Sequence, residues 1–116
     1  MAGRKAEKET RDKLFEEASH LQKAAMSGDP IPMPQRTAMR GQAAALFEQW
    51  IELEAARFNT SAQDYNKAIG GMKAALADLQ AEIDALEDAI KIVEQATVVV
   101  RAGDALLKVA IQHLPI

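Results

Sequence analysis

One apolar stripe runs without interruption from residue 68 to residue 100. Its members recur at alternating three- and four-residue steps, and this spacing returns side chains to one face of a helix about every 3.5 residues. They are Ile69, Met72, Leu76, Leu79, Ile83, Leu86, Ile90 and Val93, extended by Thr97 and Val100. Such a pattern is typical of a helix that lies along other helices. It predicts one long helix over about residues 61–114.

Two shorter segments that precede the stripe also have helical periodicity. The first predicts a helix over about residues 5–26, with the buried face Leu14, Ala18, Leu21 and Ala25. The second predicts a helix over about residues 34–57, with the seam Met39, Ala43, Leu46, Trp50 and Leu53. Trp50 is the largest apolar side chain available, so we expect it to anchor the core against the long helix, around Leu79 to Ile90.

Charge and proline mark the segments outside these helices. Eight of residues 1–13 are charged, and their opposite charges three or four positions apart support a helix by only about 0.2–0.5 kcal/mol per pair. This start is therefore expected to fray unless it is docked. Residues 27–36 contain a Ser-Gly pair and three alternating prolines, which end one helix and form a stiff connector to the next.

The pattern changes at Ile92, after which the long helix is apolar around almost its whole circumference. A helix of this kind is buried on most sides. A continuous helix would span about 80 Å, whereas each earlier helix spans about 33 Å. Either the long helix folds back near Gly103 and completes a four-helix bundle, or another chain covers its end. The residues expected on this interaction surface are Ile92, Val98, Val99, Leu106, Leu107, Ile111 and Leu114.

Composition places the chain in the all-α class. Ala, Leu, Glu, Lys and Gln dominate outside the connector, and they are the strongest helix formers. At 116 residues the chain is the size of one domain. The expected fold is a single helical domain over residues 1–116. It is a bundle of two shorter helices and one long, coiled-coil-like helix, with Gly103 as the candidate break.

Cysteine is absent, which excludes disulfides, thiolate nucleophiles and zinc–thiolate sites. The net charge of -3 is unevenly spread. Residues 1–40 carry eight Lys and Arg against six Asp and Glu, whereas residues 41–116 carry six against eleven. No apolar segment follows the basic start, so we expect no secretory leader and a cytoplasmic location; leaderless export stays open.

Groupings with chemical potential are few. Glu17 and His20 have the Glu-x-x-His spacing of di-metal carboxylate sites in helical bundles. Such a site needs a second pair, but Ala110 stands three residues before His113. Glu17 and His20 are therefore expected to be surface residues beside the buried stripe. We expect no catalytic residue, no metal and no cofactor, and hence a protein that is not an enzyme.

Nucleic-acid and membrane partners are also disfavoured. The basic residues near the start, Lys8 and Arg11 among them, are interrupted by acidic ones, so there is no basic stripe for nucleic acid. A spanning helix over residues 92–111 would place Arg101 and Asp104 near the middle of the bilayer, at about 2.5–3.5 kcal/mol each. Membrane insertion is therefore not expected.

Two classes of function remain. The favoured one is a non-catalytic helical protein–protein interaction module: a self-associating adaptor, chaperone-like protein or assembly subunit. We expect it to form a homo-oligomer, in the first instance a dimer, through residues 90–114, and to offer its C-terminal helix to any protein partner. The alternative is a membrane-active or secreted helical component whose apolar C-terminal helix is masked until use.

Overall fold

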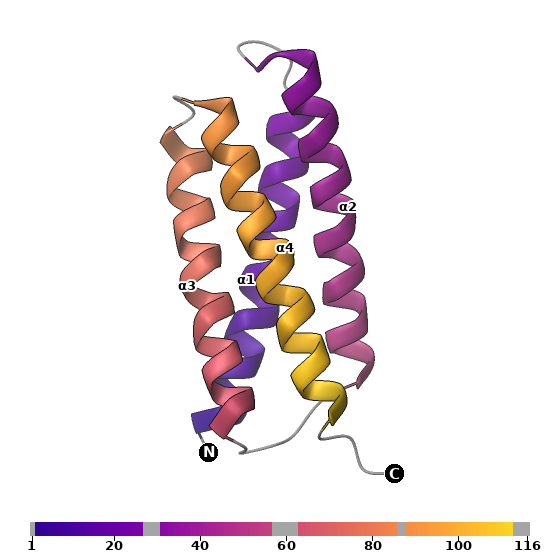
Figure 1. Cartoon of the computed structure of the whole chain (residues 1–116), viewed down its shortest axis with the longest axis vertical. Helices are drawn as coiled ribbons and strands as arrows, with labels where there is room; N and C mark the ends of the chain where they lie inside the picture. Colours follow the sequence, from indigo (N-terminus) through magenta and orange to yellow (C-terminus); the bar gives the residue numbers. More distant parts are fainter. Residues whose placement is uncertain (1, 27–30, 57–62, 86–87, 113–116) are drawn as a thin grey trace.

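The chain forms an all-helical bundle in a computed structural model (Figure 1). The structure describes residues 2–26, 31–56, 63–85 and 88–112, and the side chains of these residues apart from 2–7, 55 and 56. Four helices of similar length occupy the described segments: α1 (Ala2–Met26), α2 (Met33–Ala56), α3 (Gln63–Ala85) and α4 (Ala89–Gln112). The all-α class is confirmed, and the predicted bounds of the first two helices hold to within a few residues.

The prediction of one long helix over residues 61–114 is wrong, because the chain reverses between Ala85 and Ala89 (Figure 1). Asp88 begins α4 as a helix cap. Its Oδ1 accepts the backbone N–H groups of Ile90 at 3.0 Å and Lys91 at 3.4 Å. A side-chain oxygen in this place satisfies N–H groups that have no partner within the helix. The break therefore lies well before Gly103, which is inside α4.

The apolar stripe hides this reversal. On α3 its members from Ile69 to Ile83 are buried, but on α4 Ile90 is exposed and Val93, Thr97 and Val100 are only half-buried. The buried face of α4 is the neighbouring line Ile92, Ala96, Val99, Gly103 and Leu106. The spacing in the sequence therefore continues across the break, whereas the buried register shifts, and periodicity alone gives neither the direction nor the buried side of α4. The alternative in which the chain folds back and completes a four-helix bundle was correct. Its expected position near Gly103 was wrong, because α3 ends at Ala85 and α4 begins at Ala89.

The bundle consists of two helical hairpins, α1–α2 and α3–α4 (Figure 1). Each helix packs against two others: α1 contacts α2 and α3, and α4 contacts α3 and α2. The pairs α1/α4 and α2/α3 lie on the diagonals. Within each hairpin the helices are antiparallel, whereas the two pairs that join the hairpins, α1/α3 and α2/α4, run parallel (Figure 1).

Glutamine side chains of α2 fix how far α2 is shifted along its axis relative to α4. The amide Nε2 of Gln42 donates to the backbone carbonyl of Val93 at 3.0 Å and to Oγ1 of Thr97 at 2.9 Å. The partners lie one turn apart on α4, so a single amide spans that turn. Sliding the helices past each other would break both hydrogen bonds and leave a buried amide unpaired, which is costly.

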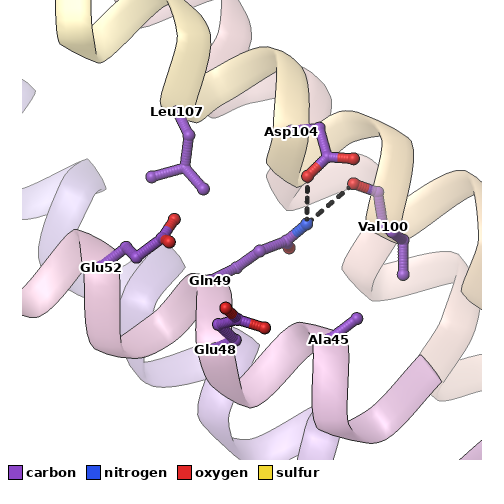
Figure 2. Close-up of a pocket in the computed structure, with 7 residues that line it drawn as sticks. All are labelled: Ala45, Glu48, Gln49, Glu52, Val100, Asp104 and Leu107. Atoms are coloured by element: carbon purple, nitrogen blue, oxygen red, sulfur yellow. Dashed lines mark hydrogen bonds between the residues drawn. The ribbon is translucent and has the colours of Figure 1, made fainter. Parts of the chain in front are cut away.

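Gln49 repeats this arrangement seven residues further along. Its Nε2 donates to the carbonyl of Val100 at 2.9 Å and to Oδ1 of Asp104 at 3.0 Å (Figure 2). Gln49 is only 4 % exposed. It fits because Gly103 lies opposite, where a Cβ atom would overlap the Gln49 amide. Gly103 therefore provides room between helices and does not break one.

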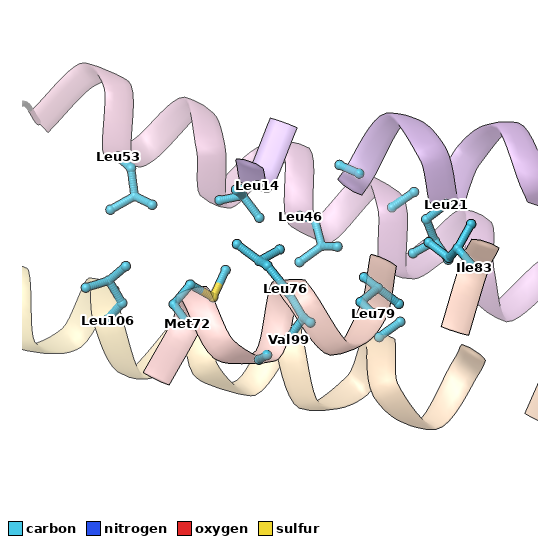
Figure 3. Close-up of a cluster of buried hydrophobic side chains, with 14 of the residues drawn as sticks. Leu14, Leu21, Leu46, Leu53, Met72, Leu76, Leu79, Ile83, Val99 and Leu106 are labelled. Carbon is cyan, nitrogen blue, oxygen red and sulfur yellow. The ribbon is translucent and has the colours of Figure 1, made fainter. Parts of the chain in front are cut away.

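The core fills the space between the four helices (Figure 3). The predicted faces of α1 and α2 are buried apart from the half-buried Trp50, and so is the stripe on α3 from Ile69 to Ile83. The largest apolar side chains that are almost fully enclosed are Leu14, Leu21, Met39, Leu46, Leu53, Tyr65, Met72, Leu76, Leu79, Ile92 and Leu106. Fully burying one Leu or Ile contributes about 1.5–3 kcal/mol, so this layer dominates the stability of the fold.

Ion pairs dock the charged first helix to both of its neighbours. Arg11 lies 3.4 Å from Glu54 of α2, and Glu9 lies 3.2 Å from Lys73 of α3. Pairs that remain in contact with water contribute about 0–1 kcal/mol each. They therefore orient α1 more than they stabilise it.

We predict that Gly103→Ala destabilises the fold by about 1–3 kcal/mol, because the new methyl group displaces the Gln49 amide from its two acceptors. The matched control is Gly70→Ala, which has open space around it and should stabilise its helix by about 0.5–1 kcal/mol. Urea unfolding followed by circular dichroism measures both changes. Stabilisation by both substitutions would show that Gln49 is not held against α4.

Candidate interaction surface

The reversal at Asp88 changes the role of the residues expected to form an interaction surface on α4. Four of them lie in the core of the bundle and are at most 9 % exposed: Ile92, Val99, Leu106 and Leu107. Leu114 lies outside the described residues. The hairpin partner α3 and the parallel neighbour α2 cover this side of α4. A second chain is not needed to bury it.

The remaining two residues of that set are exposed but do not share a face. Val98 is 47 % exposed and Ile111 is 61 % exposed. Thirteen residues separate them, which corresponds to a rotation of about 220° around the helix beyond complete turns. The structure therefore does not bring them together into one apolar surface on α4.

An exposed aromatic patch lies instead across α1 and α2. We define it as Phe15, Phe47, Trp50 and Ile51. The ring of Phe15 lies 4.8 Å from that of Trp50 and 5.6 Å from that of Phe47, between ring centroids. The tilted and edge-to-face orientations are those that aromatic pairs prefer. Phe15 is 44 % exposed and Ile51 is 58 % exposed, whereas Phe47 and Trp50 are half-buried.

Helical geometry explains why these rings meet at the surface. Phe15 follows the buried Leu14 by one position, and Phe47 follows the buried Leu46. One step along a helix turns a side chain by about 100°, which carries both rings to the edge of the α1/α2 contact. Periodicity along one helix gives no reason to bring rings from two helices together, so the sequence did not predict this patch.

Trp50 has a different partner from the one expected. It lies at the edge of the core and packs on Phe15 of α1. The region expected to pack on it, around Leu79 to Ile90, begins on α3, which lies diagonally across the bundle from α2. Trp50 therefore links the core to the exposed aromatic patch.

The Glu-x-x-His pair lies on the other side of α1. Glu17 was expected at the surface, and this is wrong: its side chain is fully buried. The helix α1 packs against both α2 and α3, so its buried arc is wider than a single stripe. His20 is partly exposed, and its Nδ1 lies 3.0 Å from Oε1 of Glu17. Glu16, Glu17 and His20 bring their ligand atoms within 4.8 Å of one another.

A lysine already supplies the positive charge at this cluster. Nζ of Lys13 lies 3.8 Å from Glu16 and 3.8 Å from Glu17, and it donates a hydrogen bond to Oε1 of Gln80 on α3. A metal ion bound by the two carboxylates would have to displace this ammonium group. The geometry therefore favours an ion-pair network that ties α1 to α3.

Burial raises the pKa of the Glu17 carboxyl above its ordinary value, because desolvation penalises the charged form. The hydrogen bond with His20 and the charge of Lys13 oppose this rise, and the neighbouring Glu16 adds to it. Burial is the largest of these effects. The cluster thus holds a proton more tightly than an exposed glutamate does.

A pocket of about 270 Å³ opens between α2 and α4 (Figure 2). Its walls combine apolar side chains with three carboxylates and the buried amide of Gln49, and its lining residues are Ala45, Glu48, Gln49, Glu52, Val100, Asp104 and Leu107. None of these residues is a serine, threonine, cysteine, lysine or histidine. The lining favours binding of a positively charged group over catalysis.

Comparisons of the chain with protein-family models, with curated proteins and with solved structures find no match. Within the described segments, no helix has the length and apolar character needed to cross a membrane.

We predict that Glu17→Gln changes how stability depends on pH. Above the ordinary carboxyl pKa of 4.5, the folded chain still holds the Glu17 proton while the unfolded chain loses it, so folding becomes less favourable as pH rises. The glutamine side chain of the variant does not titrate, so the variant does not lose stability in this way as pH rises. Its free energy of unfolding relative to the unmodified protein should increase from about pH 4 to about pH 7. A relative stability that is constant or falls over this range would contradict a buried, proton-retaining Glu17.

A second prediction concerns the contact between Phe15 and Trp50. In a double-mutant cycle with Phe15→Ala and Trp50→Ala, the coupling energy should be about 0.5–1.5 kcal/mol, the range for an aromatic pair. Urea unfolding of the four proteins gives this energy. A coupling near zero would show that the two rings do not contact each other in solution.

Proposed function

We propose that the protein is a non-catalytic helical interaction module that associates with itself, and that the aromatic patch on α1 and α2 is its contact surface. The observation that carries this proposal is the exposure of Phe15 and Ile51 beside two half-buried aromatic rings. Large apolar side chains that gather on one face of a small domain are typical of sites where another protein binds.

The composition of the patch supports protein binding. Aromatic residues are enriched at interfaces, and tryptophan is among the residues that most often dominate binding energy. The ring of Phe15 on α1 contacts both Phe47 and Trp50 on α2 and so links the rings of the two helices. A rigid apolar surface loses little side-chain entropy when a partner covers it.

The experiment that tests this function is a measurement of molar mass with a matched pair of variants. Ile51 and Ile90 are equally exposed, at 58 % and 56 %, but Ile51 belongs to the patch and Ile90 lies at the start of α4. Light scattering over a range of concentrations should show a dimer of the unmodified chain. Ile51→Ser should raise the dimer dissociation constant about tenfold, which corresponds to about 1.4 kcal/mol, whereas Ile90→Ser should leave it unchanged.

Two results would contradict the proposal. A mass that stays monomeric at every concentration would remove self-association. An equal effect of Ile51→Ser and Ile90→Ser would show that association does not depend on the aromatic patch. Circular dichroism of both variants confirms that their helices are intact.

A further inference from the structure

The side of α2 that faces away from the bundle carries one exposed line of residues. Its members recur at steps of four and three, which keeps them on one face of the helix. They are Thr37, Gly41, Ala44, Glu48 and Ile51, and all are exposed. We call this line the α2 outer face. Ala44 is its midpoint, and the aromatic patch borders it through Phe47 and shares Ile51.

Charge is separated along α2. The first half of the helix carries Arg36 and Arg40 and no acidic residue, and the second half carries Glu48, Glu52 and Glu54 and no basic residue. This order opposes the helix dipole, which favours negative charge near the first turn and positive charge near the last. The arrangement therefore does not stabilise α2 itself.

The other helices also leave most of this charge unbalanced. Glu54 pairs with Arg11 of α1 at 3.4 Å. Within the described part of the chain, Arg40, Glu48 and Glu52 form no ion pair. A surface with positive charge at one end and negative charge at the other complements a copy of itself that runs in the opposite direction.

We infer that two copies of the chain pack through their α2 outer faces in antiparallel orientation, with a two-fold axis at Ala44. This inference rests on the proposed function and names its partner as a second copy. Around such an axis, a residue a given number of positions after Ala44 lies level with the residue the same number before it on the second copy. Arg40 is then level with Glu48, and Arg36 with Glu52.

Side-chain size follows the same symmetry. Ile51, seven positions after Ala44, lies level with Thr37 of the second copy. Phe47, three positions after Ala44, lies level with Gly41, around which there is open space. Large side chains are thus level with small ones, and the small residues at the centre allow the two helices to approach closely. Parallel packing would instead place arginine level with arginine and glutamate level with glutamate.

A two-fold interface of this kind brings each aromatic patch to the side of the same contact. Symmetric dimers use one self-complementary surface on both subunits. Arg40 and Glu48 lie beside the axis, where their charges set orientation and partner choice more than affinity. The charges of the α2 outer face determine the antiparallel orientation of the two copies, and the aromatic patch provides the apolar contact area.

A single cysteine tests the position of the axis, because the chain contains no other cysteine. A residue on a two-fold axis meets its own copy, so Ala44→Cys should form a disulfide-linked dimer under mild oxidation. The control is Ala77→Cys, which is exposed on α3 and away from the proposed interface. Electrophoresis without reducing agent should show at least about tenfold more linked dimer for Ala44→Cys at the same concentration. Equal cross-linking of the two variants would overturn the inference.

A charge exchange tests the antiparallel direction. Arg40→Glu and Glu48→Arg should each raise the dimer dissociation constant about tenfold, and the double variant should restore it, because the exchanged charges are level again. A double variant as weak as the single ones would overturn the antiparallel arrangement. A dimer that survives but is linked poorly at residue 44 contradicts this arrangement alone. A chain that is monomeric at every concentration contradicts the proposed function as well.

Discussion

The reversal of the chain between Ala85 and Ala89 is the constraint on which the rest of the structure depends. It turns the apolar stripe of α3 and the α4 line of Ile92, Val99 and Leu106 toward one core. A cap at Asp88 satisfies N–H groups at the new helix start. With α4 folded back along α3, four helices of similar length can cover one another within a single chain, which a continuous helix of about 80 Å could not achieve.

The same reversal decides which surfaces remain for function. Because Ile92, Val99 and Leu106 become core residues, the C-terminal helix no longer offers a broad apolar face. The aromatic rings on α1 and α2 lie at the edge of a helix contact and are not enclosed. Parallel packing of α2 on α4 is held by Gln42 and Gln49, and it turns the outer face of α2, with its separated charges, toward the surroundings.

Much of the fold could be predicted from sequence, but the direction of the last helix could not. The periodicity of Leu14, Leu46 and Leu76 identified the buried faces, because burial repeats with the helical turn. The reversal was missed because the spacing continues through it, and an aspartate within a charged stretch is a weak signal for a cap. Glu17 was misplaced because its burial depends on α3, and the aromatic patch was missed because its members come from different helices.

The most direct test of the hairpin is the distance between α3 and α4 at sites away from the reversal. Spin labels at Lys67→Cys and Arg101→Cys, both exposed sites, can be measured by electron–electron resonance, with unlabelled protein added so that only distances within one chain contribute. Antiparallel helices packed about 8–10 Å apart predict a label distance of about 10–25 Å. A distance near 51 Å, that of 34 residues in one continuous helix, would contradict the fold.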